Sequence, residues 1–166
     1  TTDSLDSCAK LERIVKVAKR RGLDGIAVTN HNVSYQGPTE LDGIKIIPGI
    51  EITLKGGGHL LAYFIREEIE PRRTLKETVE RIKSLGGYAV LAHPFRDDHG
   101  WIKRRTEDDI SVEEALKILD GIETANASVS DEEREGRLNW VWSRPPVPIF
   151  ICPVKPASLR LRLIRS

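Results

Sequence analysis

Helical and extended apolar patterns alternate along this chain, and this alternation limits its fold more than any other feature. Residues 11–18 carry apolar side chains at helical spacing and precede Gly22, which is typical of a helix that ends at a glycine. Residues 25–29 then form an uninterrupted apolar run, as a buried strand does. Because the alternation continues to residue 124, the sequence predicts an α/β fold with a parallel or mixed sheet, either open or closed into a barrel.

Further strands are expected in five apolar runs, at residues 44–47, 50–54, 60–65, 88–92 and 121–124. Pro48 and Gly49 separate the first two runs, which indicates two strands. Three glycines at 56–58 separate the run at 50–54 from the run at 60–65. They lack the spacing of a phosphate-binding loop and therefore indicate a hairpin turn.

Two further helices are predicted from the residues at which they begin. Thr74 and Glu77 have the spacing of a capping box, in which both side chains accept hydrogen bonds from the first backbone N–H groups of a helix. Ser111 and Glu114 repeat this pattern. Helices are therefore expected to begin after Thr74 and after Ser111.

The composition is that of one ordinary globular domain. The chain has 166 residues, of which 39% are hydrophobic and 31% are charged. No apolar run approaches the ~20 residues of a membrane-spanning helix, and residues at the N-terminus lack the pattern of a signal peptide. Cys8 and Cys152 lie near opposite ends of the chain, which does not indicate a disulfide framework. A cytoplasmic protein without membrane contact is expected.

The C-terminal segment differs from the rest of the chain. Residues 1–136 contain all 25 acidic and 20 of the 26 basic residues, whereas residues 137–166 contain six basic residues, no acidic residue and five of the nine prolines. Because proline cannot donate a ladder hydrogen bond, we expect residues 137–166 not to supply the final strands of a barrel. A barrel left open on that side would expose apolar surface and favour self-association.

Polar residues lie at the strand ends where the chemistry of such folds is found. His31 closely follows the run at 25–29, and His93 follows the run at 88–92. Glu51 lies inside an apolar run, and His59 opens its expected antiparallel partner. Three of the four histidines and one carboxylate can therefore meet at one rim, where imidazole and carboxylate together suit zinc, manganese or iron.

Each of these residues also has a structural interpretation. A single histidine at a strand end is more often hydrogen-bonded than metal-bound, Glu51 could point outward from an alternating strand, and His59 could be a turn residue. His99, in a polar loop, is interpreted as solvated. His93 is the sharpest signal, because Pro94 directly follows it and excludes helical backbone.

Four segments in series resemble successive motifs of one family. They are residues 22–31 (GLDGIAVTNH), 47–53 (IPGIEIT), 58–63 (GHLLAY) and 89–95 (AVLAHPF). In this order and spacing they are similar to the polymerase and histidinol phosphatase (PHP) family of metal-dependent phosphoesterases, most of all to its stand-alone members. The resemblance implies a PHP-like domain at residues 1–136, folded as a distorted (β/α)7 barrel that is incomplete at both ends.

The resemblance assigns roles to five residues. Glu51, His59 and His93 match the family's bridging carboxylate and two later histidine ligands, which together make one complete metal site. His31 matches a histidine of a second site, and Asp6 lies where many members have a further ligand of that second site. Glu51 and His31 are the residues expected to take part in catalysis, with up to three zinc, manganese or iron ions.

Three departures from the family pattern bear on activity. The opening His-x-His would lie just ahead of Thr1, and Asn30 stands where Asp is usual. The closing Asp-x-His has no counterpart, since no histidine follows His99. The site at Glu51 keeps three protein ligands, and three ligands with an open position can still bind zinc and activate water.

Two classes of function remain open. The leading one is a metal-dependent phosphoesterase, impaired in this chain, that hydrolyses phosphate mono- or diesters in a phosphorylated small molecule, a nucleotide or an oligonucleotide end, as a 5′ exonuclease does. The alternative is a metal-binding pseudoenzyme or regulatory domain without turnover. An unrelated amidohydrolase barrel shares the histidine-rich rim but usually has an opening His-x-His and a late Asp.

Overall fold

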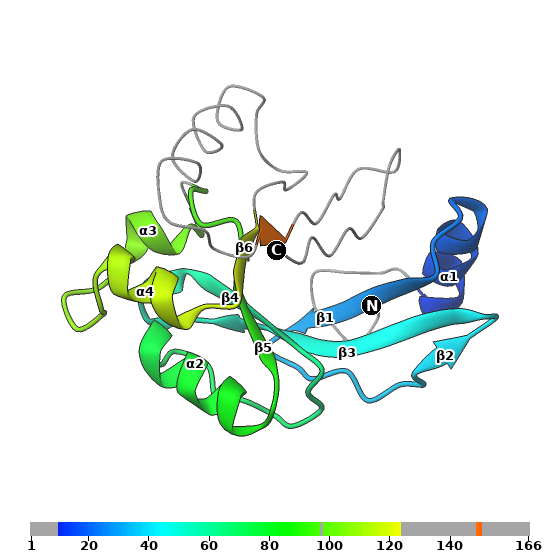
Figure 1. Ribbon diagram of the computed structural model, residues 1–166, viewed down its shortest axis with the longest axis horizontal. Coiled ribbons are helices and arrows are strands. Elements are labelled where there is room, and N and C mark those ends of the chain that lie inside the picture. The colour runs from blue at the N-terminus through cyan, green and yellow to red at the C-terminus, as the bar shows by residue number, and fades with distance from the viewer. Residues whose placement is uncertain (1–9, 97, 124–148, 151–166) are drawn as a thin grey trace.

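The computed structural model describes residues 10–96, 98–123 and 149–150 (Figure 1). Within these ranges, seven strands form one sheet that is flanked by helices. The strands are β1 (Gly25–His31), β2 (Glu40–Leu41), β3 (Ile44–Thr53), β4 (His59–Tyr63), β5 (Tyr88–Leu91), β6 (Gly121–Glu123) and β7 (Ile149–Phe150). The helices are α1 (Leu11–Arg20), the 3-10 turn η1 (Lys55–Gly57), α2 (Leu75–Ser84), α3 (Trp101–Arg104) and α4 (Val112–Ile118).

The sheet is mixed, as the sequence predicts. Its neighbouring strands follow the order β1, β3, β4, β5, β6, β7, and β2 pairs with β3 outside this path. The pairs β1–β3, β5–β6 and β6–β7 are parallel, whereas β2–β3, β3–β4 and β4–β5 are antiparallel. The α/β class is therefore confirmed, and closure into a (β/α)7 barrel stays a prediction.

β3 is one continuous strand, so the expectation of two strands separated at Pro48 and Gly49 is wrong. Pro48 lies just before the first β3–β4 pair, Gly49 with Tyr63, so its missing N–H falls at the end of that ladder, and its carbonyl still accepts the N–H of Phe64 at 2.8 Å. Gly49 allows a close approach, because a Cβ atom there would lie 2.4 Å from the carbonyl oxygen of Ala62. Both residues fit the strand at these positions instead of ending it.

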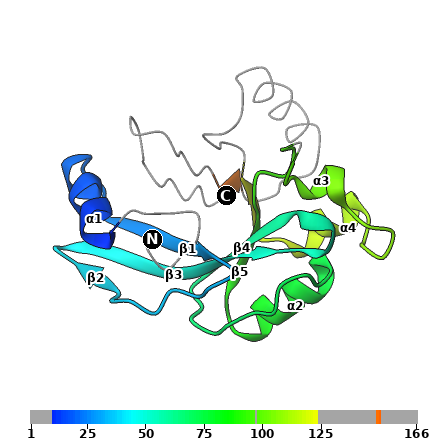
Figure 2. The same ribbon diagram turned by 180° about the vertical axis from the view of Figure 1, so that it is seen from behind.

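α1 ends at its glycine as expected. Gly22 has a φ of +67°, and the N–H groups of Gly22 and Leu23 donate to the carbonyls of Lys19 and Ala18. The helix buries Val15 and Ala18 in a cluster with apolar residues of the first halves of β1 and β3, namely Ile26, Val28, Ile44 and Ile46. α1 lies at the opposite end of the molecule from α2, α3 and α4 (Figure 1; seen from behind in Figure 2).

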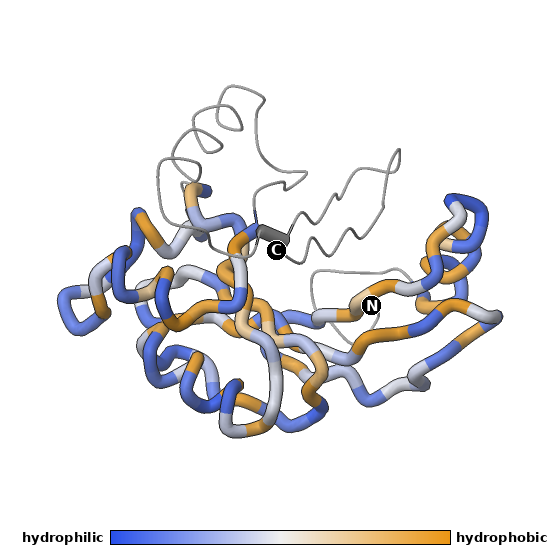
Figure 3. Tube along the Cα trace, viewed as in Figure 1, coloured by the Kyte–Doolittle hydropathy of each residue, from blue (hydrophilic) through white to orange (hydrophobic). Residues whose placement is uncertain are grey.

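Both expected capping boxes are present. Glu77 and Glu114 each donate a backbone N–H to the hydroxyl three residues earlier, at 3.3 Å from Thr74 and 3.2 Å from Ser111. Their carboxylates accept the backbone N–H groups of those two residues at 3.0 Å and 2.9 Å. In Figure 3, α2 shows apolar positions among mostly hydrophilic ones, as expected of a helix with one buried face.

The central strands present two unlike faces. Ile50 and Ile52 of β3 are fully buried in the main core, together with residues of α2 and α4. Because side chains alternate along a strand, Glu51 between them points to the other face of the sheet. Leu61, which pairs with Glu51, is buried on that second face beside Val90. The candidate ligands lie on this face.

β7 lies in the segment, residues 137–166, that we expect not to supply the final strands of a barrel, and it is the last strand of the sheet. Ile149 and Phe150 pair in parallel with Ile122 and Glu123 of β6 and continue the sheet. The reason is local, because the four residues between Pro148 and Pro153 all have backbone N–H groups. The boundary at residue 136 and the rest of this segment lie outside the described residues.

No helix in the described ranges combines the length and the apolar character needed to cross a membrane.

Candidate metal centre

Neighbouring strands bring the candidate residues to one edge of the sheet. Glu51 lies near the end of β3, and the register pairs it with His31, the last residue of β1. His59 is the first residue of β4, opposite Thr53. Because β4 runs antiparallel to β3, its start lies beside the end of β3. His93 lies two residues beyond β5 and completes the group.

The turn η1 sets the position of His59. Gly56 and Gly57 have φ values of +84° and +97°, which glycine adopts without steric cost. A Cβ atom at Gly56 would lie 2.3 Å from the carbonyl oxygen of Arg104, and the Nε of Arg104 donates to the carbonyl of Gly56 at 2.7 Å. The expected hairpin turn is therefore confirmed, and it is held against the end of α3.

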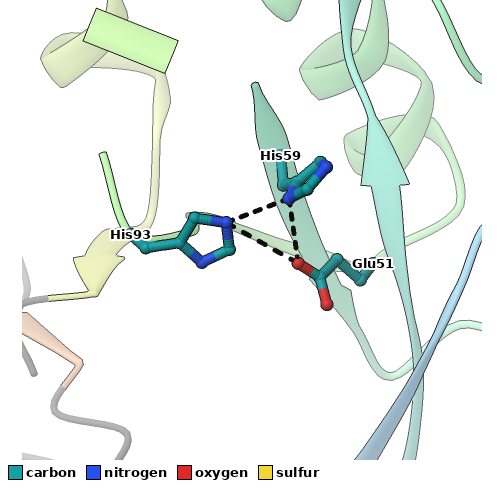
Figure 4. Close-up of side chains that lie close together, drawn as sticks. All are labelled: Glu51, His59 and His93. Atoms are coloured by element: carbon teal, nitrogen blue, oxygen red, sulfur yellow. Dashed lines mark hydrogen bonds and ion pairs between the residues drawn. The ribbon is translucent and has the colours of Figure 1, made fainter. Parts of the chain in front are cut away.

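Glu51, His59 and His93 point toward one another (Figure 4). The Nδ1 of His59 lies 2.9 Å from the Nε2 of His93 and 3.2 Å from the Oε1 of Glu51, and the Nε2 of His93 lies 3.9 Å from the same oxygen. Ligand atoms about 2.1 Å from a tetrahedral zinc ion are about 3.4 Å apart, within the range of these three separations. The three donors therefore fit a divalent cation.

Charge in the site is concentrated on Glu51. Burial of its side chain raises the pKa, but the hydrogen bond from His59 and the charges of His59, His93 and His31 outweigh that effect. The pKa of Glu51 is therefore held below its ordinary value of 4.5. A carboxylate that stays ionised among imidazoles is the form that binds a metal.

His31 lies next to this group and outside it. Its Nδ1 is 3.8 Å from the second oxygen of Glu51, and its ring makes an edge contact with that of His59, with centroids 4.6 Å apart. Its Nε2 lies 3.2 Å from the hydroxyl of Thr53. Asn32 holds Thr53 in place, because its amide donates to the hydroxyl at 2.9 Å and accepts the backbone N–H of Thr53 at 2.8 Å.

Proteins of known sequence match parts of the chain. No family model matches it. An uncharacterized protein from Methanocaldococcus jannaschii is 33% identical over 96 residues, which cover 54% of this chain and 55% of that protein. An error-prone DNA polymerase from Symbiobacterium thermophilum is 36% identical over 61 residues, which cover 34% of this chain and 6% of the polymerase.

Solved structures match more of the chain. Endonuclease Q from Pyrococcus furiosus matches with a TM-score of 0.61 and 17% identity, over 89% of this chain and 45% of that one. A two-domain protein from Bacteroides vulgatus that contains a predicted PHP-like metal-dependent phosphoesterase matches with a TM-score of 0.53 and 22% identity, over 82% of this chain and 45% of that one. The chain has a PHP-like fold. The resemblance inferred from four sequence segments is thereby confirmed, and the chain spans about half the length of these relatives.

Glu123 is a buried carboxylate beside the candidate metal centre that the motifs do not assign. It ends β6, and its Oε2 accepts the backbone N–H of His93 at 2.7 Å and lies 3.3 Å from the Nδ1 of the same residue. The signal was present in the sequence, because a single acidic residue near the end of an apolar strand is also what marks Glu51.

His99, interpreted from the sequence as solvated, contacts a residue of the candidate metal centre. Its side chain is 45% exposed, but its ring stacks on that of His59, with centroids 5.0 Å apart and 20° between the planes. Desolvation is the largest cause that lowers the pKa of His99, and the charge of Asp98 opposes it. Asn30 is buried in β1, and Asp6 lies outside the described residues.

Proposed function

We propose that this chain is a metal-dependent phosphoesterase domain in which Glu51, His59 and His93 hold a divalent cation. The observation that carries the proposal is the spacing of their three donor atoms, 2.9, 3.2 and 3.9 Å apart at one edge of the sheet. The PHP-like fold supports it, because a protein of similar fold is described as containing a predicted PHP-like metal-dependent phosphoesterase. Zinc, manganese and iron all suit two imidazoles and one carboxylate.

In this proposal, residues of the chain bind the cation and leave it accessible to a substrate. Three protein donors leave other coordination positions accessible to a phosphate ester. The chemistry that a divalent cation supplies in such a site is polarisation of a phosphoryl oxygen and a lower pKa of water. The second oxygen of Glu51 faces His31, and we propose His31 and Asp6 as ligands of a second cation on that side.

We propose phosphate mono- or diesters as substrates, in nucleotides or in nucleic acid. Support comes from Endonuclease Q, which was solved with a 27-mer duplex that has an abasic lesion at the active site. Residues 1–136 carry more acidic than basic residues, so a nucleic acid would be recognised at the site and not by general attraction to the surface. Self-association, a cytoplasmic location and the division at residue 136 stay predictions.

Metal binding without turnover is the second candidate. Within the described ranges, Glu51, His59 and His93 are the one group of His, Cys, Asp or Glu residues whose ligand atoms all lie within 4.8 Å of one another. Hydrolysis of phosphate esters by two cations uses a larger set of ligands. A chain with one such group can bind a cation and still lack the groups for fast turnover.

The proposal is tested by hydrolysis of p-nitrophenyl phosphate, bis-p-nitrophenyl phosphate and an oligonucleotide with an abasic site, each with added Mn²⁺ or Zn²⁺. Turnover that disappears in Glu51→Gln and persists in Glu40→Gln, a matched change in the exposed part of β2, supports a phosphoesterase. Metal binding in calorimetry without hydrolysis of any substrate favours the second candidate. If the protein shows neither metal binding nor hydrolysis, that result contradicts the metal centre itself.

A further inference from the structure

We infer that Glu123 is a positioning residue of the metal centre: its carboxylate keeps the ring proton of His93 on Nδ1, which leaves Nε2 available to the cation. The inference rests on the proposed function, because His93 is one of the three proposed ligands. It adds to that function a residue outside the three ligands that determines how well they bind.

Glu123 makes two contacts with His93 through a single oxygen. Its Oε2 accepts the backbone N–H of His93 at 2.7 Å and lies 3.3 Å from the Nδ1 of the ring. Both side chains are buried, at 5% exposure for Glu123 and 6% for His93. Because a carboxylate only accepts hydrogen bonds, an oxygen 3.3 Å from Nδ1 favours the ring form with its proton on that nitrogen.

The other ring nitrogen of His93 faces the metal centre. Its Nε2 lies 2.9 Å from the Nδ1 of His59 and 3.9 Å from the Oε1 of Glu51. A neutral imidazole with its proton on Nδ1 has its lone pair on Nε2, and that lone pair is what binds a metal. Glu123 therefore lies at the Nδ1 side of the His93 ring, and the ligands Glu51 and His59 lie at its Nε2 side.

The backbone of His93 also needs support. Its φ is +26°, which is uncommon for a residue other than glycine, and such a conformation persists where the surrounding structure holds it. The hydrogen bond from the His93 N–H to Glu123 is a contact that does so. Glu123 therefore restrains both the backbone and the ring of one ligand.

The sheet places Glu123 where these contacts can form. β6 is parallel to β5, with Ile122 opposite Leu91, and both side chains are buried in the main core. Alternation then directs the side chain of Glu123 to the opposite face, which carries the metal centre. His93 follows β5 and reaches the same place from the neighbouring strand.

Asp120 offers a matched control for Glu123. Its carboxylate also accepts a backbone N–H from β5, that of Ala89, at 2.7 Å. Ala89 lies near the start of β5, whereas His93 lies beyond its end. Loss of Asp120 therefore removes a comparable hydrogen bond at the opposite end of the same strand.

The first test needs no variant. Nitrogen-15 NMR of the histidine rings in the full, metal-free chain, in alkaline buffer where the ring carries one proton, reports which nitrogen of His93 is protonated. A proton on Nδ1 supports the inference, and a proton on Nε2 overturns it. This readout is independent of activity and of metal binding.

The second test is calorimetric titration of Mn²⁺ into the wild type, Glu123→Ala, Glu123→Gln and Asp120→Ala. Loss of such a contact typically lowers metal affinity about 10–100-fold, and we expect this in Glu123→Ala. Glu123→Gln should recover most of the affinity, because an amide oxygen can accept the backbone N–H of His93 and stay near Nδ1. Asp120→Ala should bind as the wild type does.

Equal affinity in Glu123→Ala and the wild type, or an equal loss in Asp120→Ala, would overturn the inference. If Glu123→Ala does not fold, the wild-type ring spectrum decides alone. If the wild type binds no Mn²⁺, the proposed function fails, whereas the spectrum still decides where His93 carries its proton.

Discussion

The Oε1 of Glu51 lies 3.2 Å from the Nδ1 of His59, although the two residues are not opposite each other in the β3–β4 pair. The register pairs Glu51 with Leu61 and Thr53 with His59, so the contact runs diagonally across the two strands. The spacing of the candidate donors therefore depends on the strand register and on the η1 turn that determines it.

One divalent cation per chain is expected to bind more tightly than any second one, because a single group of three donors is assembled among the described residues. Elemental analysis after dialysis against Mn²⁺ or Zn²⁺ measures this. Metal content should fall in Glu51→Ala, His59→Ala and His93→Ala and should fall less in His31→Ala. Unchanged content in all of the first three variants would refute the ligand assignment.

Gly56→Ala should destabilise the protein by more than the ~1–2 kcal/mol that left-handed backbone costs an alanine, because the new Cβ would also lie 2.3 Å from the carbonyl oxygen of Arg104. Gly86→Ala is the matched control, since Gly86 has a φ of +76° and nothing within 4 Å of an added Cβ. Urea unfolding measures both variants. Equal losses would show that the turn is not held against α3.

Thr74→Ala should lower the free energy of unfolding by about 1 kcal/mol, because α2 loses the hydroxyl that accepts the N–H of Glu77. Thr39→Ala, in an exposed loop, should have little effect. Urea unfolding curves of the two variants and the wild type provide the comparison. A loss in Thr74→Ala no larger than that in Thr39→Ala would contradict the capping role.

Glu77 and Glu114 should titrate below the ordinary glutamate value of 4.5, because hydrogen bonds from Thr74 and Ser111 lower the pKa of each carboxyl group. The folded pKa of each carboxyl group lies below the unfolded one, so its hydrogen bonds stabilise the folded state when it is ionised. This contribution to the free energy of unfolding is fully present above about pH 4.5 and is lost as the pH falls through the folded pKa values. Side-chain carbon NMR titrations measure both values. In Ser111→Ala the pKa of Glu114 should return toward 4.5.

Local rules predicted where helices begin more accurately than where strands end. The capping boxes at Thr74 and Ser111 predicted where α2 and α4 begin, because a helix start depends on hydrogen bonds within four residues. Pro48 was misleading, since proline ends a strand only where its N–H would have joined a ladder. Whether an N–H at residue 48 would join a ladder depends on where β2 and β4 pair with β3. The residues near Pro48 do not predict that pairing.

The sequence by itself determined the order of the longer helices and strands and the choice of Glu51, His59 and His93 as candidates, because apolar periodicity, caps and polar residues at strand ends are local features. Only the tertiary structure decided that Glu51 faces the histidines instead of solvent and that Glu123 contacts His93. These contacts join residues on different strands, and their existence depends on register, on which face the helices cover and on the hydrogen bonds that buried polar groups require.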